Sequence, residues 1–143
     1  MKKYLLLLLI LMVNEVFSQK NIGVPISNIK KKYKESKYQL KQNKEDDGTI
    51  TIDVKLQNAY ASYTFDDKYK LSTMLVITPF DQKSLNNYIV EYDSKYKRLN
   101  SDVVKWEFET KISDEVSIAE HIILSKMSAE NGESWYTLTW LFE

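Results

Sequence analysis

The sequence has no cysteine and only one histidine, three glycines and two prolines in 143 residues. Without cysteine, no disulfide and no thiolate metal site can form, so packing must stabilise the fold. A single histidine is too few for an imidazole-based zinc site. Few glycines and prolines, together with 13% aromatic residues, argue against disorder. The sequence therefore predicts a folded domain with no metal and no cofactor.

The sequence also lacks an excess of charge of either sign, with 20 basic and 20 acidic side chains. This balance argues against nucleic acid as a partner. One local excess is a cluster of five lysines between 30 and 37, which could attract an anionic lipid, a polyanionic glycan or nucleic acid. Because Glu35 and Asp46-Asp47 lie near the cluster in the sequence, we interpret it as a solvated helix face.

The first apolar run is too short for a membrane span. Met1–Tyr4 is positively charged, Leu5–Val13 is apolar, and small Ser18 follows, which is typical of a secretory signal. A spanning helix needs about 20 apolar residues. We therefore predict a signal peptide at 1–18 and a single domain at 19–143, with no membrane span in the mature chain. The predicted location is the periplasm or the cell exterior.

Helical periodicity occurs in two segments. Ser27 is the expected N-cap of a short helix over 27–36, in which apolar residues four apart share one face. Asp81 is the expected N-cap of a longer helix over 82–99. Its apolar stripe contains Leu85, Tyr88, Ile89, Tyr92, Tyr96 and Leu99.

Alternating apolar and polar residues predict strands in the rest of the chain. Asp47-Gly48 and Asn131-Gly132 are hairpin signals, because glycine readily takes the positive φ that tight turns need. The expected strands cover residues 38–41, 50–56, 61–65, 71–77, 104–109, 116–127 and 136–142. The predicted fold class is α+β, a two-layer sandwich of two helices on a mainly antiparallel sheet of about six or seven strands. The helix-then-strands unit occurs twice, although no residue-level repeat is visible.

Three patterns that could support chemistry have simpler structural interpretations. Asn43–Gly48 resembles the start of a calcium loop, but position twelve is Val54 where a bidentate glutamate is needed, so we interpret the segment as a hairpin turn. His121 is the only histidine, and the sequence around it shows no motif of a metal site or a catalytic triad. It is interpreted as a residue on a sheet face. Glu107 and Glu109 are two residues apart on one strand face, a spacing at which two carboxylates could act together in glycoside hydrolysis. Strand alternation, however, directs both side chains towards solvent. The sequence thus predicts no catalytic residue.

One strand places aromatic residues on both of its faces. Tyr136, Leu138, Trp140 and Phe142 alternate with Trp135, Thr137, Thr139 and Leu141. The first set is more apolar and is expected to form the core. Trp135, Thr137 and Leu141 then form a possible partner surface on the opposite face. Tyr60, which is out of phase with Tyr63, is a second candidate for exposure.

A low-specificity resemblance covers about half of the mature chain. Tyr63–Asp66, the strand that ends at Pro79, the Tyr-rich helix and Trp106 form a pattern similar to small uncharacterised exported proteins of Bacteroidota-type bacteria. The signal that ends in Phe17-Ser18-Gln19 is similar too. The resemblance implies the periplasm or cell exterior, and it implies no activity and no site residues.

We expect the mature chain to be a non-catalytic binding module for an envelope protein or glycan. The absence of clustered histidine, serine and glycine-rich motifs favours this hypothesis over a small hydrolase with a site assembled from scattered polar residues. An inhibitor of a secreted enzyme is a further alternative with the same sequence features. The sequence leaves the ligand, the oligomeric state and the strand order open.

Overall fold

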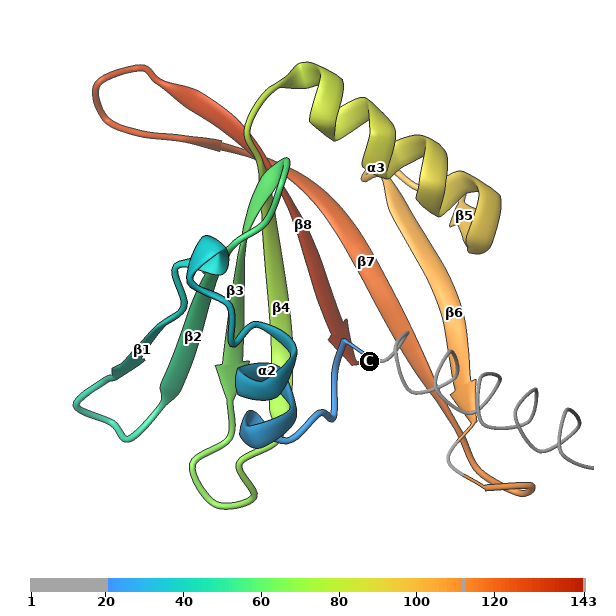
Figure 1. Cartoon of the computed structure of the whole chain (residues 1–143). Helices are drawn as coiled ribbons and strands as arrows, with labels where there is room; N and C mark the ends of the chain where they lie inside the picture. The colour runs from blue at the N-terminus through green and yellow to red at the C-terminus, as the bar shows by residue number, and fades with distance from the viewer. Residues whose placement is uncertain (1–20, 112, 143) are drawn as a thin grey trace, which may run out of the picture.

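A single antiparallel sheet forms most of the molecule (Figure 1). The computed structural model describes residues 21–111 and 113–142, so the predicted signal peptide lies outside the described residues. Among them are two α-helices, one 3-10 helix and eight strands. In chain order these are α2 (Ile26–Lys32), η1 (Ser36–Tyr38), β1 (Lys41–Lys44), β2 (Ile50–Lys55), β3 (Ala59–Phe65), β4 (Ser72–Pro79), α3 (Gln82–Lys95), β5 (Lys97–Leu99), β6 (Lys105–Lys111), β7 (Ser117–Ser128) and β8 (Ser134–Phe142).

From each edge of the sheet, consecutive strands follow one another inward to the centre. The order is β1-β2-β3-β4-β8-β7-β6-β5, so each half consists of four consecutive strands, and β4 pairs with β8 at the centre. A helix precedes each set of four strands, α2 in the first half and α3 in the second. The helix-then-strands unit that is visible in the sequence is therefore also the unit of the architecture.

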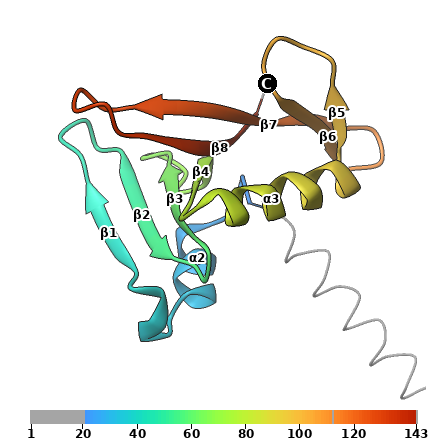
Figure 2. The same ribbon diagram turned by 90° about the horizontal axis from the view of Figure 1, so that it is seen from above.

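Both helices lie on the same side of a strongly bent sheet. Figure 2 shows the sheet turning from β1–β4 to β7 and β8, with α2 and α3 inside the angle. The opposite side carries no helix among the described residues, and we call it the open face. None of the helices in this part of the chain has the length and apolar character needed to cross a membrane.

The core lies between the helices and the inner face of the sheet. Strand alternation places Ile52, Tyr63, Leu75, Leu138 and Trp140 there, each at most 2% exposed. This arrangement confirms the expected phase of β8, in which one set of alternating residues forms the core. The α+β class and the antiparallel sheet are likewise confirmed.

The expected number of strands was too low. The sheet has eight strands rather than six or seven, because β5 occupies residues that the sequence assigned to the second helix. Helix α3 ends at Lys95, and Tyr96 is extended with φ −128° and ψ 157°. The chain then pairs Arg98 with Trp106 in β6. Long-range pairing thus overrides a helical periodicity that continues to Leu99.

The first helix also differs from its expected bounds. It covers Ile26–Lys32 rather than residues 27–36, and its N-cap is Pro25 instead of Ser27. Pro25 suits a helix start because its fixed φ, here −61°, is already close to the helical value. Asp81 is confirmed as the N-cap of α3, since its Oδ1 accepts a hydrogen bond of 2.7 Å from the Ser84 backbone N–H. That bond lowers the pKa of the Asp81 carboxyl.

The two predicted hairpin turns are confirmed. Gly48 connects β1 to β2 with φ +89°, and Gly132 connects β7 to β8 with φ +85°. In the first turn, the Asp47 carboxylate accepts a 2.8 Å hydrogen bond from the Thr49 backbone N–H. The Asn43–Gly48 segment is therefore part of a hairpin, as interpreted from the sequence.

Candidate functional site on the open face

Several short hydroxyl side chains lie on the open face of the central strands. Strand alternation directs them away from the core, because their neighbours along each strand are the buried apolar residues. The partly exposed ones are Thr51, Ser62, Thr64, Thr78 and Thr139, whereas Thr137 on the same face is only 8% exposed. A surface of this kind offers many hydrogen-bond donors and acceptors to a ligand.

Four large apolar side chains interrupt this polar surface near one end of the central strands. Tyr60 is 54% exposed, Phe80 43%, Met127 45% and Trp135 39%. The Tyr60 and Phe80 rings meet edge to face, with centroids 4.9 Å apart. Trp135 pairs with Met127 across β7 and β8. We call these four residues the apolar row.

The register of the sheet explains why residues so far apart in sequence form a row. Tyr60 in β3 pairs with Thr78 in β4, and the Phe80 backbone N–H donates a 3.0 Å hydrogen bond to the Asn58 carbonyl. On the other side of β4, Phe80 and Trp135 line one hollow of about 190 Å³. The row therefore crosses β3, β4, β8 and β7.

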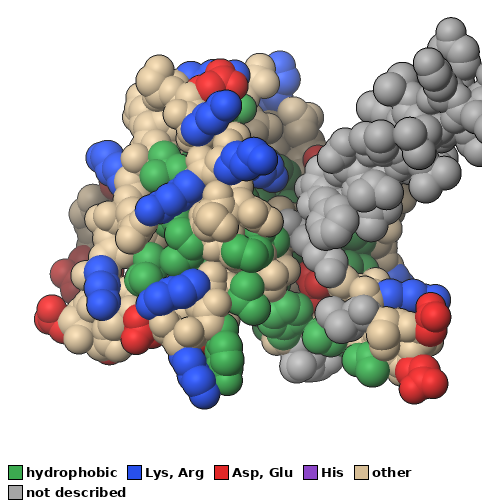
Figure 3. Space-filling view, turned by 60° about the horizontal axis from the view of Figure 1, so that its bottom comes forward, with side chains coloured by type: hydrophobic (Ala, Val, Ile, Leu, Met, Phe, Trp, Pro, Cys, Tyr) green, Lys and Arg blue, Asp and Glu red, His purple; other side chains and the backbone are tan. Residues whose placement is uncertain are grey.

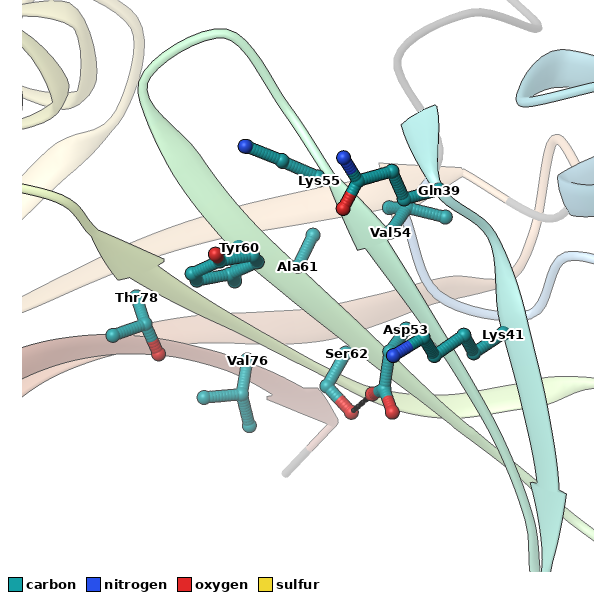
Figure 4. A pocket seen from close by; sticks show the side chains of 10 residues that line it. All are labelled: Gln39, Lys41, Asp53, Val54, Lys55, Tyr60, Ala61, Ser62, Val76 and Thr78. Atoms are coloured by element: carbon teal, nitrogen blue, oxygen red, sulfur yellow. Dashed lines mark hydrogen bonds between the residues drawn. The ribbon is translucent and has the colours of Figure 1, made fainter. Parts of the chain in front are cut away.

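A groove of about 350 Å³ adjoins the row at Tyr60. Figure 4 shows the Tyr60 ring and Thr78 on one side of it, with Gln39 and Lys41 on the other. The remaining lining residues come from β2, β3 and β4, namely Asp53, Val54, Lys55, Ala61, Ser62 and Val76. Lys55 also borders a second hollow of about 360 Å³ that contains Lys37 and Tyr38.

Asp53 is the fixed polar group of the groove. Its Oδ1 accepts a hydrogen bond of 2.6 Å from the Ser62 hydroxyl, and its Oδ2 accepts one of 3.2 Å from the Asn43 amide. These bonds hold the carboxylate in one orientation while leaving lone pairs free to accept further hydrogen bonds. Lys41 is the cross-strand partner of Asp53. The site therefore combines an aromatic wall, an oriented carboxylate and flexible ammonium groups.

The three residues predicted as a partner surface differ in exposure. Trp135 is 39% exposed, Leu141 is half-buried, and Thr137 is only 8% exposed. Leu141 is six positions after Trp135 in the same strand, which is roughly 20 Å at the usual rise. The neighbours of Trp135 are instead Phe80 and Met127. Tyr60 was identified from strand phase alone, whereas the groove depends on the pairing of β1, β2, β3 and β4.

The other candidate residues lie away from the groove. His121 is 1% exposed, and its Nε2 lies 3.3 Å from Glu107 Oε2. A substrate could not reach this imidazole directly. Glu109 is exposed on the same face of β6 as Glu107. Within residues 21–111 and 113–142, no three histidine, aspartate or glutamate side chains gather as a metal-binding group.

No protein-family model, no curated protein and no solved structure matches this chain.

Proposed function

We propose that the mature chain is an exported, non-catalytic binding module that holds an envelope glycan on its open face. The observation that carries this proposal is the exposed ring of Tyr60, which forms one wall of the groove. The rest of the lining includes side chains that can bond to sugar hydroxyls, namely Gln39, Asp53, Ser62 and Thr78. The proposed location is the periplasm or the cell exterior, from the signal pattern in the first 18 residues.

The chemistry of a sugar matches the two kinds of surface in the groove. A pyranose ring has faces of C–H groups, which pack on the electron-rich face of an aromatic ring. Its hydroxyls donate to carboxylates and accept from amides, hydroxyls and ammonium groups. Tyr60 supplies the aromatic surface, while Asp53 and Gln39 supply polar partners. The volume of about 350 Å³ lies near the lower end of the range for small-ligand sites.

The pattern of exposure favours a glycan over a protein partner. A protein interface usually has a closely packed apolar centre within roughly 800 Å² per partner. The apolar row is instead a single line of side chains, with hydroxyl residues beside it. A glycan chain is narrow and polar, so it can follow such a line while its hydroxyls bond to the residues alongside.

Calorimetric titration with soluble oligosaccharides from envelope glycans and exopolysaccharides tests the proposal. We expect Tyr60→Ala to weaken the binding of a recognised oligosaccharide roughly tenfold or more, as truncation of a central aromatic contact does. Tyr69→Ala is the matched control, because Tyr69 is 65% exposed and lies outside the groove. It should leave the affinity unchanged.

Two results would overturn the glycan proposal. One is that no oligosaccharide of the panel binds the intact mature chain. The other is that a protein partner, and no saccharide, is captured in a way that depends on Tyr60. Circular dichroism of both variants checks that the sheet is intact, which we expect because both tyrosine side chains are more than half exposed.

A further inference from the structure

We infer that the groove recognises an acidic glycan, with its carboxylates placed at Lys41 and at Lys55. This inference rests on the proposed function and adds the charge class of the ligand. It follows from the charged side chains that line the groove and the hollow beside it.

The two lysines of the groove are available to a ligand. Neither Lys41 nor Lys55 forms an ion pair or a side-chain hydrogen bond within the described part of the chain. The carboxylate of the groove, Asp53, already accepts hydrogen bonds from Ser62 and Asn43. The groove lining thus has two ammonium groups and a single carboxylate that already has other partners, and an anionic ligand would balance the excess positive charge.

The part of the chain that contributes the groove has a net positive charge. Residues 21–79 contain ten lysines and seven carboxylates, whereas residues 80–142 contain seven basic and eleven acidic side chains. Figure 3 shows lysine and arginine side chains spread over the half that carries α2. The opposite charges of the two parts largely cancel, and the net charge of the whole sequence is zero. The five lysines between 30 and 37 account for this excess, and they lie in the segment of α2 and η1 rather than on the open face. The positive charge at the groove itself is that of Lys41 and Lys55.

The second hollow extends the positive surface beyond one sugar unit. It shares Lys55 with the groove and adds Lys37 beside the ring of Tyr38. Lys37 has a partner in Glu35, with 2.9 Å between its Nζ and Glu35 Oε2. Lys55 thus has a tyrosine and a second lysine on each side, Tyr60 and Lys41 in the groove and Tyr38 and Lys37 in the second hollow. A polymer with a carboxylate on successive units matches this repetition better than a single acidic sugar does.

The test compares one glycan in two charge states. A short oligouronate and the same oligosaccharide with each carboxylate reduced to a primary alcohol are titrated into the mature chain. We expect the reduced form to bind about fivefold more weakly, as the loss of two exposed charge contacts predicts. The preference should vanish when salt rises from about 0.1 M to about 1 M, because the screening length falls to ~3 Å.

The combined variant Lys41→Gln and Lys55→Gln should remove the preference, so that the oligouronate and its reduced form bind the variant with equal affinity. Lys83→Gln with Lys126→Gln is the matched control, because these exposed lysines lie in the acidic half of the chain, and it should keep the preference. Equal binding of the two glycans overturns the inference while the proposed function stands. If neither glycan binds, nor any other saccharide, the proposed function fails as well. Binding to anionic phospholipid vesicles in place of both glycans also overturns the inference.

Discussion

Buried tyrosines give the core a polar component at the scale of single residues. The Tyr63 and Tyr33 hydroxyls lie 3.0 Å apart, and the Tyr92 hydroxyl accepts a 3.3 Å hydrogen bond from Trp140 Nε1. Each phenol thus has a partner inside the apolar layer, which avoids the cost of an unsatisfied buried group. Burial raises the pKa of Tyr63 and of Tyr92 far above the usual value near 10. It raises the pKa of Tyr88 to about 12.

These pKa shifts predict loss of stability in alkali. The unfolded chain loses its tyrosine protons at about pH 10, whereas the folded chain keeps those of Tyr63 and Tyr92 well beyond that pH. The contribution of these tyrosines to the unfolding free energy is therefore fully present below about pH 10 and decreases as the pH rises further. The expected slope of the unfolding free energy is about 1.4 kcal/mol per pH unit for each buried tyrosine.

Urea titrations at a series of alkaline pH values measure this slope. Tyr63→Phe should make the decline shallower by about the contribution of one group, or ~1.4 kcal/mol per pH unit. Tyr69→Phe serves as the control, since Tyr69 is 65% exposed. The interpretation fails if stability stays constant above about pH 10, or if both variants change the slope equally.

The inward or outward direction of most strand residues was predictable from the sequence. Alternation alone placed Trp140 and Leu138 in the core and Tyr60 and Trp135 on the other face. Alternation does not predict which outward side chains of different strands contact one another. Tyr60 and Phe80 touch because β3 and β4 pair in one register. That register depends on contacts between distant segments, which one sequence does not display.

At the scale of elements, helix α3 is fixed to the sheet at both ends. Asp81 caps its first turn, and Leu85 and Tyr92 are each 3% exposed beneath it. Near its other end, Trp106 Nε1 donates a 2.7 Å hydrogen bond to Asp93. The apolar stripe predicted from the sequence includes Tyr88, Ile89 and Tyr92. Of these, only Tyr92 is fully buried, since Tyr88 and Ile89 are half-buried at the edge of the contact.

Truncation on the buried side of α3 should therefore be costly. We expect Leu85→Ala to lower the unfolding free energy by about 2 to 5 kcal/mol, because it removes a buried side chain and leaves a cavity. Ile89→Ala should cost less than this, since Ile89 is only half-buried. Asn87→Ala, on the exposed side, should change stability by less than about 0.5 kcal/mol. Urea denaturation of the three variants gives the ranking, and an equal loss at Leu85 and Asn87 would refute the assigned face.

The limits of elements were less predictable than their existence. The capped start of α3 was predictable because Asp81 provides a local hydrogen bond. Its end was not, because Tyr96 continues the helical spacing. The structure uses Tyr96 differently, stacking its ring on Phe108 with centroids 4.5 Å apart. This contact and the pairing of β5 with β6 are long-range, so they outweigh a local preference for helix.

At the scale of the whole molecule, two similar halves share one core. The buried apolar residues form one cluster that includes Ile52 and Tyr63 of the first half and Trp106 and Ile122 of the second. The central β4–β8 pairing and helix α3 join the halves, since Tyr88 donates a 3.0 Å hydrogen bond to Asn58 in the β2–β3 turn. The halves nevertheless differ in charge and in the shape of the open face, which confines the candidate site to one of them and to the central seam.

This shared core predicts that the two halves unfold together. All three tryptophans, Trp106, Trp135 and Trp140, lie in the second half. Tryptophan fluorescence therefore reports on that half, whereas far-ultraviolet circular dichroism reports on the entire sheet. In urea the two signals should follow one coincident transition, as expected for a single cooperative domain.

A variant in the first half makes this prediction stricter. Ile52 is fully buried in β2, with no tryptophan in its own half of the sheet. Ile52→Ala should lower the unfolding free energy by about 2 to 5 kcal/mol, and it should move the fluorescence midpoint as far as the dichroism midpoint. If the halves were independent, the fluorescence transition would keep its position while the dichroism signal split in two. That outcome would mean that the β4–β8 seam joins two separate domains, and that the groove and the apolar row are not held together by one core.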